Sequence, residues 1–232
     1  MTSELASPLA EVSDHYLGEK GSSYFEWQGG AGEFFAQILA HRFRPYVNPT
    51  DVLVDFGCGG GFLLKALQCG RRIGIEVNPC ARRHAIGLGI KCYETPDEIP
   101  PSTADVVISN HALEHVMNPI SALKALRTTL RPGSCIVLCV PIENFRFAGR
   151  YDPEDRNHHL YTWTAQLLGN CLVEAGYEIV AIKYRIHMWP RRWTMACYNR
   201  FPLWLFNFIC YCYAKLTGGG RELLAVARRP AN

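Results

Sequence analysis

The chain has 232 residues and a mass of 26.1 kDa, and 48% of its residues are hydrophobic and 19% charged. This length and composition exclude a disordered chain and suit one or two domains with a sizeable core. The formal net charge of +3 is too small to indicate nucleic-acid binding by itself. No apolar run reaches the roughly 18–20 residues that cross a bilayer, and residues 1–14 lack the apolar stretch of a secretory signal.

Charge is unevenly distributed along the chain. Residues 183–232 contain nine lysines and arginines and one acidic residue, Glu222, so the remainder of the chain is net acidic. A basic end on an acidic body suggests a charged partner or surface at that end.

Ten cysteines are spread over the chain, and none of them forms a Cys-x-x-Cys pair. This spacing does not fit a zinc ribbon or a redox dithiol. Several lie in apolar stretches, where a free thiol packs as a small hydrophobic group. In the absence of a signal sequence, we expect reduced thiols and a cytoplasmic protein.

In chain order, the predicted elements begin after a polar, loose arm at residues 1–23. The predicted helices cover residues 33–46, 62–67, 80–88, 120–130, 164–175 and 201–216. The predicted strands cover residues 52–56, 72–77, 90–93, 104–109, 134–140, 177–184 and 222–228, with a turn at 131–133.

The predicted strands are short apolar runs, which indicates burial on both faces and therefore a parallel sheet covered by helices. We predict an α/β fold: a Rossmann-like, doubly wound sheet in three αβα layers, with its ligand beyond the carboxyl ends of the strands. The predicted organisation is an N-terminal arm and capping helix at 1–48 and a main domain at 49–232. The main domain carries an aromatic and basic helical insertion at about 186–220.

A glycine-rich loop joins the first predicted strand to the following helix, and residues 55–61 read DFGCGGG. Glycines let the backbone approach a ligand closely, and the helix start offers free N–H groups. The Asp55 carboxylate at the strand tip would repel a pyrophosphate and attract a cationic amino group. No Lys-Ser/Thr follows the glycines, which excludes a P-loop.

A second acidic residue, Glu76, ends the second predicted strand, 17 residues after Gly59. An acid at this strand tip can accept both hydroxyls of a ribose, and the adjacent Val77 offers an apolar face for an adenine. Two acids and a glycine loop therefore fit a ligand built from an adenosine and a positively charged amino acid.

Together these segments resemble the class I S-adenosylmethionine-dependent methyltransferases. The matching sequences are VDFGCGGG at 54–61, GIEVNP at 74–79, ADVVISN at 104–110, LEHV at 113–116 and LRPG at 130–133. The resemblance covers about residues 50–142. It implies a seven-stranded sheet whose last strand is antiparallel, and S-adenosyl-L-methionine as the cofactor.

The resemblance also assigns roles in cofactor binding. Gly57, Cys58 and Gly59 would pass beneath the methionine moiety through their backbone, and Asp55 would help to hold its amino group. Glu76 would bind the ribose hydroxyls and Val77 the adenine. Ser109 and Asn110, at the tip of the fourth strand, would lie beside the methionine and the methyl group.

Histidines are the candidate bases. Methyl transfer is an in-line displacement on an activated carbon, so the protein mainly orients the acceptor, and an oxygen acceptor benefits from a base of near-neutral pKa. His111 is the first candidate, and His159 is the second and would line the acceptor pocket. For His115 a structural, hydrogen-bonded role is the favoured interpretation. His158 and His159 lack an identified third ligand, so we expect no metal.

Two segments are candidates for covering the site: the aromatic residues 24–28, for which packing at the sheet edge is an equal alternative, and the loop at 142–156. The insertion at about 186–220 is unusually aromatic, because residues 184–213 hold ten of the 27 aromatic residues of the chain. Its predicted helix is apolar almost all round and roughly 24 Å long, too short for a bilayer of about 30 Å. Burial or a dimer contact is therefore favoured. Nearby basic and aromatic residues would instead suit a membrane surface or a lipid-linked acceptor; these are Arg185, Trp189, Arg191, Arg192, Trp193 and Arg200.

The sequence therefore predicts a S-adenosylmethionine-dependent methyltransferase that acts on a small-molecule or lipid-linked acceptor, with oxygen preferred and nitrogen or carbon possible. An NAD-dependent oxidoreductase is the enzymatic alternative, disfavoured by Asp55 and by the glycine register. A non-catalytic cofactor-binding scaffold of the same fold is the other. A nucleic-acid acceptor is disfavoured, because residues 109–112 read SNHA instead of an Asn/Asp-Pro-Pro-aromatic signature. A homodimer and peripheral membrane contact through residues 185–216 are the further partner hypotheses.

Overall fold

A computed structural model describes residues 13–29, 32–143, 149, 151–187, 198, 200–217 and 219–231. The first half of the predicted arm and part of the loop at 142–156 lie outside these residues. So do Trp189, Arg191, Arg192 and Trp193 of the insertion.

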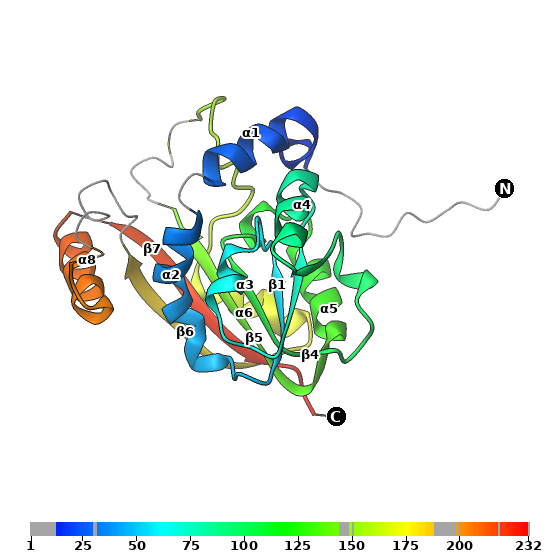
Figure 1. Ribbon diagram of the computed structural model, residues 1–232. Helices are drawn as coiled ribbons and strands as arrows, with labels where there is room; N and C mark the ends of the chain where they lie inside the picture. The colour runs from blue at the N-terminus through cyan, green and yellow to red at the C-terminus, as the bar shows by residue number, and fades with distance from the viewer. Residues whose placement is uncertain are drawn as a thin grey trace.

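A seven-stranded sheet in the order β3-β2-β1-β4-β5-β7-β6 forms the centre of the molecule (Figure 1). Strands β1 to β5 run parallel to one another, whereas β7 is antiparallel to both β5 and β6. This confirms the predicted α/β class and the antiparallel last strand, which lies between β5 and β6. The strands are β1 (Val52–Phe56), β2 (Arg71–Ile75), β3 (Lys91–Tyr93), β4 (Ala104–Asn110), β5 (Leu130–Ile142), β6 (Glu178–His187) and β7 (Gly220–Arg228).

Helices cover both faces of the sheet (Figure 1). The helices are α1 (Gly18–Gly29), α2 (Gly32–Phe43), α3 (Phe62–Ala66), α4 (Pro79–Gly87), α5 (Pro119–Thr129), α6 (Ala165–Glu174) and α8 (Leu203–Thr217). The 3-10 turns used below are η1 (Asp14–Tyr16) and η4 (Leu113–His115).

Local sequence explains where the helices begin and end. The Asn78 side chain accepts hydrogen bonds from the backbone N–H groups of Cys80 and Ala81, and Pro79 follows it at the first helical position of α4. Thr164 caps α6 in the same way through the N–H of Leu167. These caps fix the residue at which each of the two helices begins.

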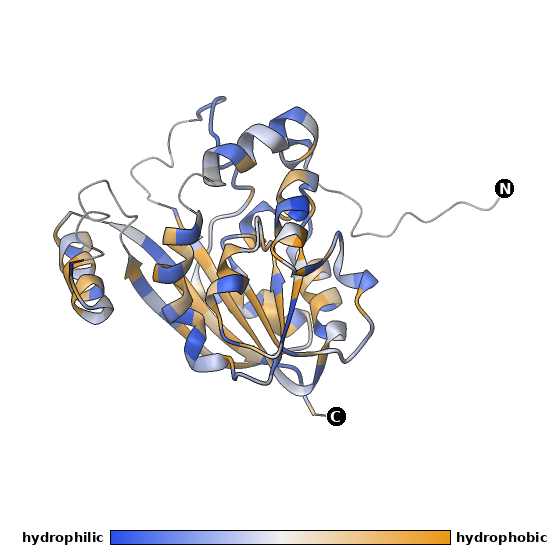
Figure 2. Cartoon of the chain, in the orientation of Figure 1, coloured by the Kyte–Doolittle hydropathy of each residue, from blue (hydrophilic) through white to orange (hydrophobic). Residues whose placement is uncertain are grey.

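The core has two halves, one on each face of the sheet. Side chains of α2, α3 and α4 pack on one face, around Leu53 and Val137, and side chains of α5 and α6 pack on the other, around Val54 and Ile136. Figure 2 shows the apolar residues concentrated along the strands and the polar residues on the outer sides of the helices. The three-layer arrangement predicted from strand burial is therefore confirmed.

Part of the predicted N-terminal arm is helical. Residues 18–23 belong to α1, although serine and glycine favour helices weakly. Tertiary contacts compensate: the Asn78 side chain donates to the carbonyl oxygen of Gly21 over 2.7 Å. A Cβ at Gly21 would lie 2.1 Å from the carbonyl oxygen of Tyr16, so this close approach requires glycine. In β5, the residues predicted as a turn at 131–133 are part of the strand.

Helix α8 is buried on one face only, so the expectation of a helix buried within the chain is wrong for its other face, while the alternative of a dimer contact stays a prediction. Phe206 and Ala214 are buried, but an opposite face is open to solvent. Its exposed large side chains are Trp204 (71% exposed), Phe208 (60%), Tyr211 and Leu216. Among the residues that the structure describes, none of the helices combines the length and apolarity that crossing a membrane requires.

Candidate active site

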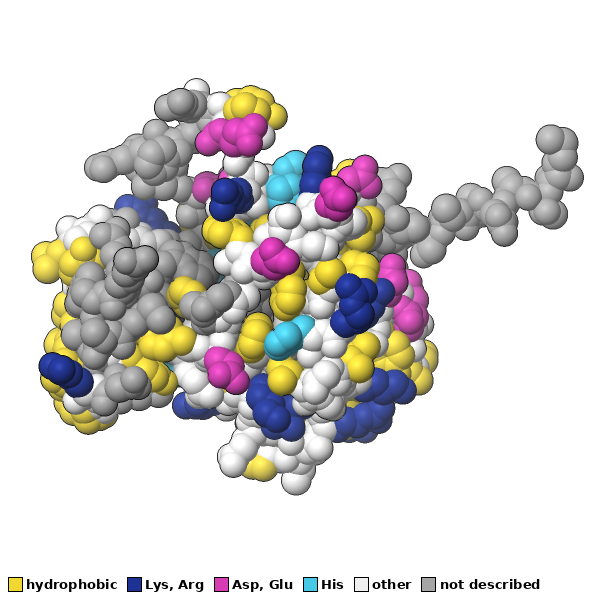
Figure 3. All heavy atoms as spheres, turned by 45° about the horizontal axis from the view of Figure 1, so that its top comes forward, with side chains coloured by type: hydrophobic (Ala, Val, Ile, Leu, Met, Phe, Trp, Pro, Cys, Tyr) yellow, Lys and Arg dark blue, Asp and Glu magenta, His cyan; other side chains and the backbone are white. Residues whose placement is uncertain are grey.

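A cavity of about 890 Å³ lies at the carboxyl ends of β1, β2 and β4, bounded by residues of α1 and α2. Figure 3 turns this end of the molecule, at the top of Figure 1, toward the viewer. Most of the predicted site residues line the cavity. They are Asp55, Gly57, Cys58, Gly59, Glu76, Val77, Asn110, His111 and His159.

The glycine loop is a tight turn held against β2. The backbone N–H groups of Gly57 and Cys58 both donate to the carbonyl oxygen of Ile75. Gly57 has a φ of +72°, and a Cβ there would lie 2.3 Å from the Cβ of Ala112. Only glycine fits both the left-handed backbone and this approach. The loop therefore presents backbone rather than side chains to the cavity.

Glu76 is fixed at the tip of β2 by two backbone hydrogen bonds. Its Oε2 accepts from the N–H of Gly59 and its Oε1 from the N–H of Asn78, both over 2.8 Å. Burial raises the pKa of Glu76, and these hydrogen bonds together with Arg82 counteract that rise. Each carboxylate oxygen has a second lone pair. The positioned carboxylate can therefore accept hydrogen bonds from the hydroxyl groups of a ligand in the cavity.

Asp55 is a buried carboxylate that faces the cavity, with 2% of its side chain exposed. Its Oδ1 has no hydrogen-bond partner among the described residues. Burial raises the pKa of Asp55 well above its usual range, and the Glu76 carboxylate raises it further. Leaving such a group unpaired costs free energy, which a cationic ligand would recover. The orphaned oxygen fits the ammonium group of S-adenosylmethionine.

Ser109 is the predicted site residue that the structure does not bring to the cavity. Its side chain is 1% exposed and its hydroxyl donates to the carbonyl oxygen of Phe56 over 2.9 Å. Successive side chains of a strand point to opposite faces, so Asn110 reaches the cavity and Ser109 does not. The expected position of Ser109 beside the methyl group is thus corrected: it ties β4 to the end of β1.

His111 follows β4 with a left-handed backbone, φ +52°, which is unfavourable for a residue with a side chain. Its backbone N–H donates to the carbonyl oxygen of Cys139 over 2.8 Å. Burial lowers the pKa of His111. The imidazole at the cavity wall is therefore neutral at pH 7, the form that can accept a proton.

His115 and Glu114 lie beside His111. The His115 Nδ1 is 2.6 Å from the hydroxyl of Tyr16, to which it is hydrogen-bonded, and burial lowers the pKa of His115 to about 3. Glu114 is fully buried, its carboxyl oxygens have no hydrogen-bond partner in the described part of the chain, and burial raises its pKa to about 8. Both side chains are therefore neutral at pH 7. His115 has the hydrogen bond that a structural role requires, yet it also lines the cavity.

The ring of His159 lies against that of His115, and its Nδ1 is hydrogen-bonded to a carboxylate oxygen of Glu143. The ligand atoms of Glu114, His115 and His159 all lie within 4.8 Å of one another. The structure thus brings donors near His159 that the sequence did not reveal, and the donor atoms of His111, Cys139 and Glu222 are grouped as closely. The expectation of a site without metal stays a prediction.

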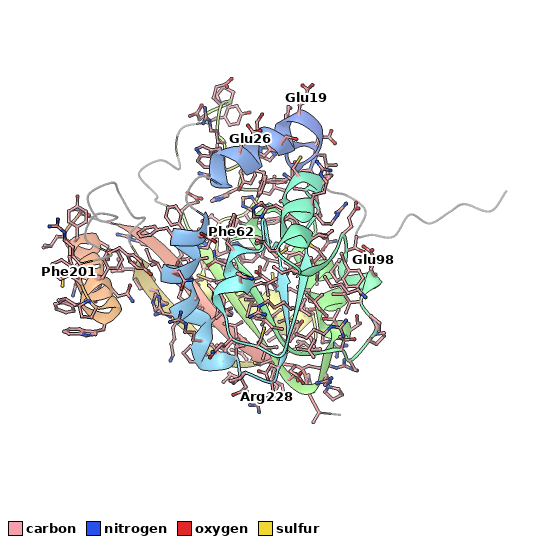
Figure 4. All side chains as sticks on the ribbon, in the orientation of Figure 1. Glu19, Glu26, Phe62, Glu98, Phe201 and Arg228 are labelled. Carbon is pink, nitrogen blue, oxygen red and sulfur yellow. The ribbon has the colours of Figure 1, made fainter. Side chains whose placement is uncertain are left out.

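Aromatic side chains of α1 and α2 form much of the remaining wall. Tyr24, Phe25 and Trp27 of α1 line the cavity, as does Phe35 of α2. Figure 4 shows Phe62, another lining residue, at the start of α3 beneath α1, whereas Phe201 lies far away beside α8. Segment 24–28 therefore adjoins the cavity, as the covering interpretation requires. Tyr16 and Arg221 also reach the wall, and no local sequence signal marks either.

Comparison with known proteins agrees with this architecture. The chain matches the model of a family described as a methyltransferase domain over residues 27–182. It belongs to that family, and its fold is that of the class I S-adenosylmethionine-dependent methyltransferases. Use of S-adenosylmethionine follows from this membership.

Three relatives illustrate the breadth of the similarity. An uncharacterized methyltransferase of Schizosaccharomyces pombe is 39% identical over 32% of this chain and 32% of its own length. The ubiquinone biosynthesis O-methyltransferase of Serratia proteamaculans is 27% identical over 57% of this chain and 63% of its own. The chain therefore spans less than two thirds of either relative. A S-adenosylmethionine-dependent methyltransferase structure from Archaeoglobus fulgidus has a TM-score of 0.61 at 18% identity, over 88% of this chain and 99% of that one.

Proposed function

We propose that this protein transfers the methyl group of S-adenosylmethionine to a hydroxyl oxygen of a small or medium acceptor with an apolar body. The observation that carries the proposal is the neutral His111 imidazole in the same cavity as the orphaned Asp55 carboxylate. The name of the Serratia relative, an O-methyltransferase, supports oxygen as the acceptor atom. In this proposal the described part of segment 1–48 caps a methyltransferase domain at 49–232.

The cofactor occupies the half of the cavity beside β1 and β2. Asp55 holds its ammonium group, the glycine loop passes beneath its methionine moiety, and Glu76 accepts its ribose hydroxyls. Val77 borders the adenine and Asn110 the methionine. When bound, the cofactor supplies an activated methyl carbon.

The acceptor occupies the other half, between the histidine cluster and α1. His111 takes the hydroxyl proton, and His159, held by Glu143, is the alternative base. Tyr24, Trp27 and Phe35 form an aromatic wall of this half of the cavity, and its polar side chains lie mainly beside the histidines. Such a lining supports an acceptor with an apolar body.

A peripheral membrane contact through α8 forms part of the proposal. Three basic residues are near the exposed aromatic face of α8 in the chain, namely Arg200, Lys215 and Arg221. Figure 3 shows a group of hydrophobic side chains at the left of the molecule, the side on which Figure 1 labels α8. Apolar and basic groups together suit an anionic lipid surface. Arg221 also lines the cavity, and ring contacts through Tyr198 connect α8 with α2. A lipid-linked acceptor could reach the site from this side.

Vesicle flotation tests the membrane contact. We expect the protein to float with vesicles of phosphatidylglycerol and phosphatidylcholine, and the double variant Trp204→Ser/Phe208→Ser to remain at the bottom. Exposed Tyr151, replaced by Ser, is the matched control and should still float. No flotation of the parent protein would refute the contact, and a dimer detected by light scattering that dissociates in the double variant would assign the face to a second copy.

The activity is tested by formation of S-adenosylhomocysteine with simple catechols and alkylphenols as model acceptors. We expect turnover that falls about 100-fold or more in His111→Ala, a typical loss for a general base, while S-adenosylhomocysteine binding persists. His41→Ala is the matched control, because His41 of α2 does not line the cavity and its Nδ1 bonds to the carbonyl oxygen of Ile38 in the same helix. Thermal stabilisation by NAD and not by S-adenosylhomocysteine would overturn the proposal in favour of the oxidoreductase. Cofactor binding without methylation of any acceptor would favour the scaffold.

A further inference from the structure

A buried ion pair lies behind His111, outside the cavity wall. Arg42 of α2 and Glu222 of β7 are 5% and 1% exposed, and their Nη1 and Oε2 atoms are 3.0 Å apart. Neither side chain lines the cavity. Because desolvation offsets much of the attraction, such a pair contributes little stability compared with apolar packing. A positional role explains its presence better than stability does.

The same carboxylate oxygen faces the proposed base. Glu222 Oε2 lies 3.5 Å from Nε2 of His111. The Arg42 Nη1 that binds it is also 3.5 Å from Oδ1 of Asn110 and 3.7 Å from Sγ of Cys139. Three elements far apart in sequence, α2, β7 and the tip of β4, therefore meet at one carboxylate. The guanidinium occupies the position of a counter-charge, which disfavours a cation at the neighbouring His111, Cys139 and Glu222 donors.

We propose that Glu222 is a positioning residue for His111, with its carboxylate accepting the Nε2 proton of the neutral imidazole, and that Arg42 holds that carboxylate in place. This leaves Nδ1 unprotonated. The inference rests on the proposed function, because it takes His111 as the base. The inference adds Glu222 of β7 to the residues of the site, although Glu222 lies outside all the sequence segments that resemble the methyltransferase family.

The proton balance follows from this tautomer. As the acceptor oxygen bonds to the methyl carbon, the carbon–sulfur bond breaks and its electron pair stays on sulfur. The hydroxyl proton passes to Nδ1 of His111. The resulting imidazolium is stabilised by the Glu222 carboxylate until it releases a proton to water.

Several charged and titratable groups surround His111. They are Arg42, Glu114, His115, Cys139, His159 and Glu222. The charges of two of them, Glu222 and Arg42, have opposite effects on the pKa of His111. Burial lowers the pKa of His111 most, Glu222 raises it, and Arg42 and His159 lower it. Removing the charge of Glu222 therefore lowers the pKa of His111, and removing that of Arg42 raises it.

The experiment measures the pH dependence of kcat in Glu222→Gln, Arg42→Gln and the double variant. We expect the acid limb to move to lower pH in Glu222→Gln and to higher pH in Arg42→Gln, with kcat about tenfold or more below wild type in the first. Each single variant leaves one buried charge without its partner, which can prevent folding. The double variant removes both charges and therefore serves as the second test. Its kcat should fall similarly while its Kd for S-adenosylhomocysteine stays within about twofold.

The matched control is Glu114→Gln. Glu114 lies 3.9 Å from the other nitrogen of His111, but with a pKa of about 8 it is neutral below that pH. Its replacement should leave the position of the acid limb unchanged. Unchanged kcat and an unchanged acid limb in both Glu222→Gln and the double variant, with the fold intact, would overturn the positioning role.

A second readout separates this inference from the proposed function. Nitrogen-15 NMR of the imidazole should show His111 protonated at Nε2 in the wild type and a mixture of tautomers in Glu222→Gln. This result would support the positioning role even if no acceptor were methylated. A wild-type His111 protonated at Nδ1 would overturn it even if methylation were observed.

Discussion

Replacing Glu114 by Gln should stabilise the protein, and increasingly so as the pH rises. Glu114 is fully buried without hydrogen bonds to its carboxyl oxygens, and burial raises its pKa from 4.5 to about 8. In the unfolded chain the carboxyl ionises near its ordinary pKa, whereas in the folded protein it holds its proton up to about pH 8. The stabilisation of the folded state relative to the unfolded state is therefore complete below pH 4.5 and is lost as the pH rises toward 8.

The magnitude follows from the pKa difference. Each pH unit in this window costs the wild type about 1.4 kcal/mol, or about 5 kcal/mol over the whole range. Gln at position 114 mimics the protonated carboxyl and does not titrate. The variant should therefore gain about 2–3 kcal/mol relative to the wild type between pH 5 and pH 7.

Urea unfolding of both proteins at pH 5, 6 and 7 measures this difference. His115, whose pKa is lowered to about 3, contributes an opposite slope below pH 6.5, but it is present in both proteins and largely cancels in the difference. A stability difference that does not change with pH would refute the reasoning, because Glu114 would then be ionised in the folded state.

Three further substitutions test the site. Gly57→Ala should weaken S-adenosylhomocysteine binding by about tenfold or more in calorimetry, because the new Cβ would meet Ala112; an unchanged Kd would contradict the tight turn. Ser109→Ala should keep that Kd and lose about 1 kcal/mol of stability to urea, since it removes one buried hydrogen bond; weaker binding would return Ser109 to the site. Tyr16→Phe removes the hydrogen bond to His115 and should speed limited proteolysis before α1, and equal digestion rates would show that η1 is held otherwise.

The sheet and the acidic residues at its edge could be predicted from the sequence for a physical reason. Strands buried on both faces are apolar runs, so the acids that end them stand out, and parallel strands bring their carboxyl ends to one edge. Asp55 and Glu76 are therefore adjacent in the cavity wall. Ser109 was misplaced because an apolar run does not reveal which face each residue of the strand occupies.

The remaining features depend on tertiary contacts. Helix α1 forms despite weak propensity, since Asn78 of another element binds its backbone. Arg42 and Glu222 are far apart in the chain and meet only when α2 packs against the sheet. The exposed face of α8 could not be distinguished from its buried face, because both are apolar.

The most direct test of the cofactor site is calorimetry of Asp55→Asn and Glu76→Gln with two ligands, S-adenosylhomocysteine and methylthioadenosine, which lacks the amino-acid part. Loss of the Asp55 charge should weaken S-adenosylhomocysteine about tenfold or more and leave methylthioadenosine nearly unaffected, as removal of a charged hydrogen bond predicts. Loss of the Glu76 charge should weaken both ligands. Wild-type affinity for both ligands in both variants would contradict the assignment of these carboxylates to the cofactor.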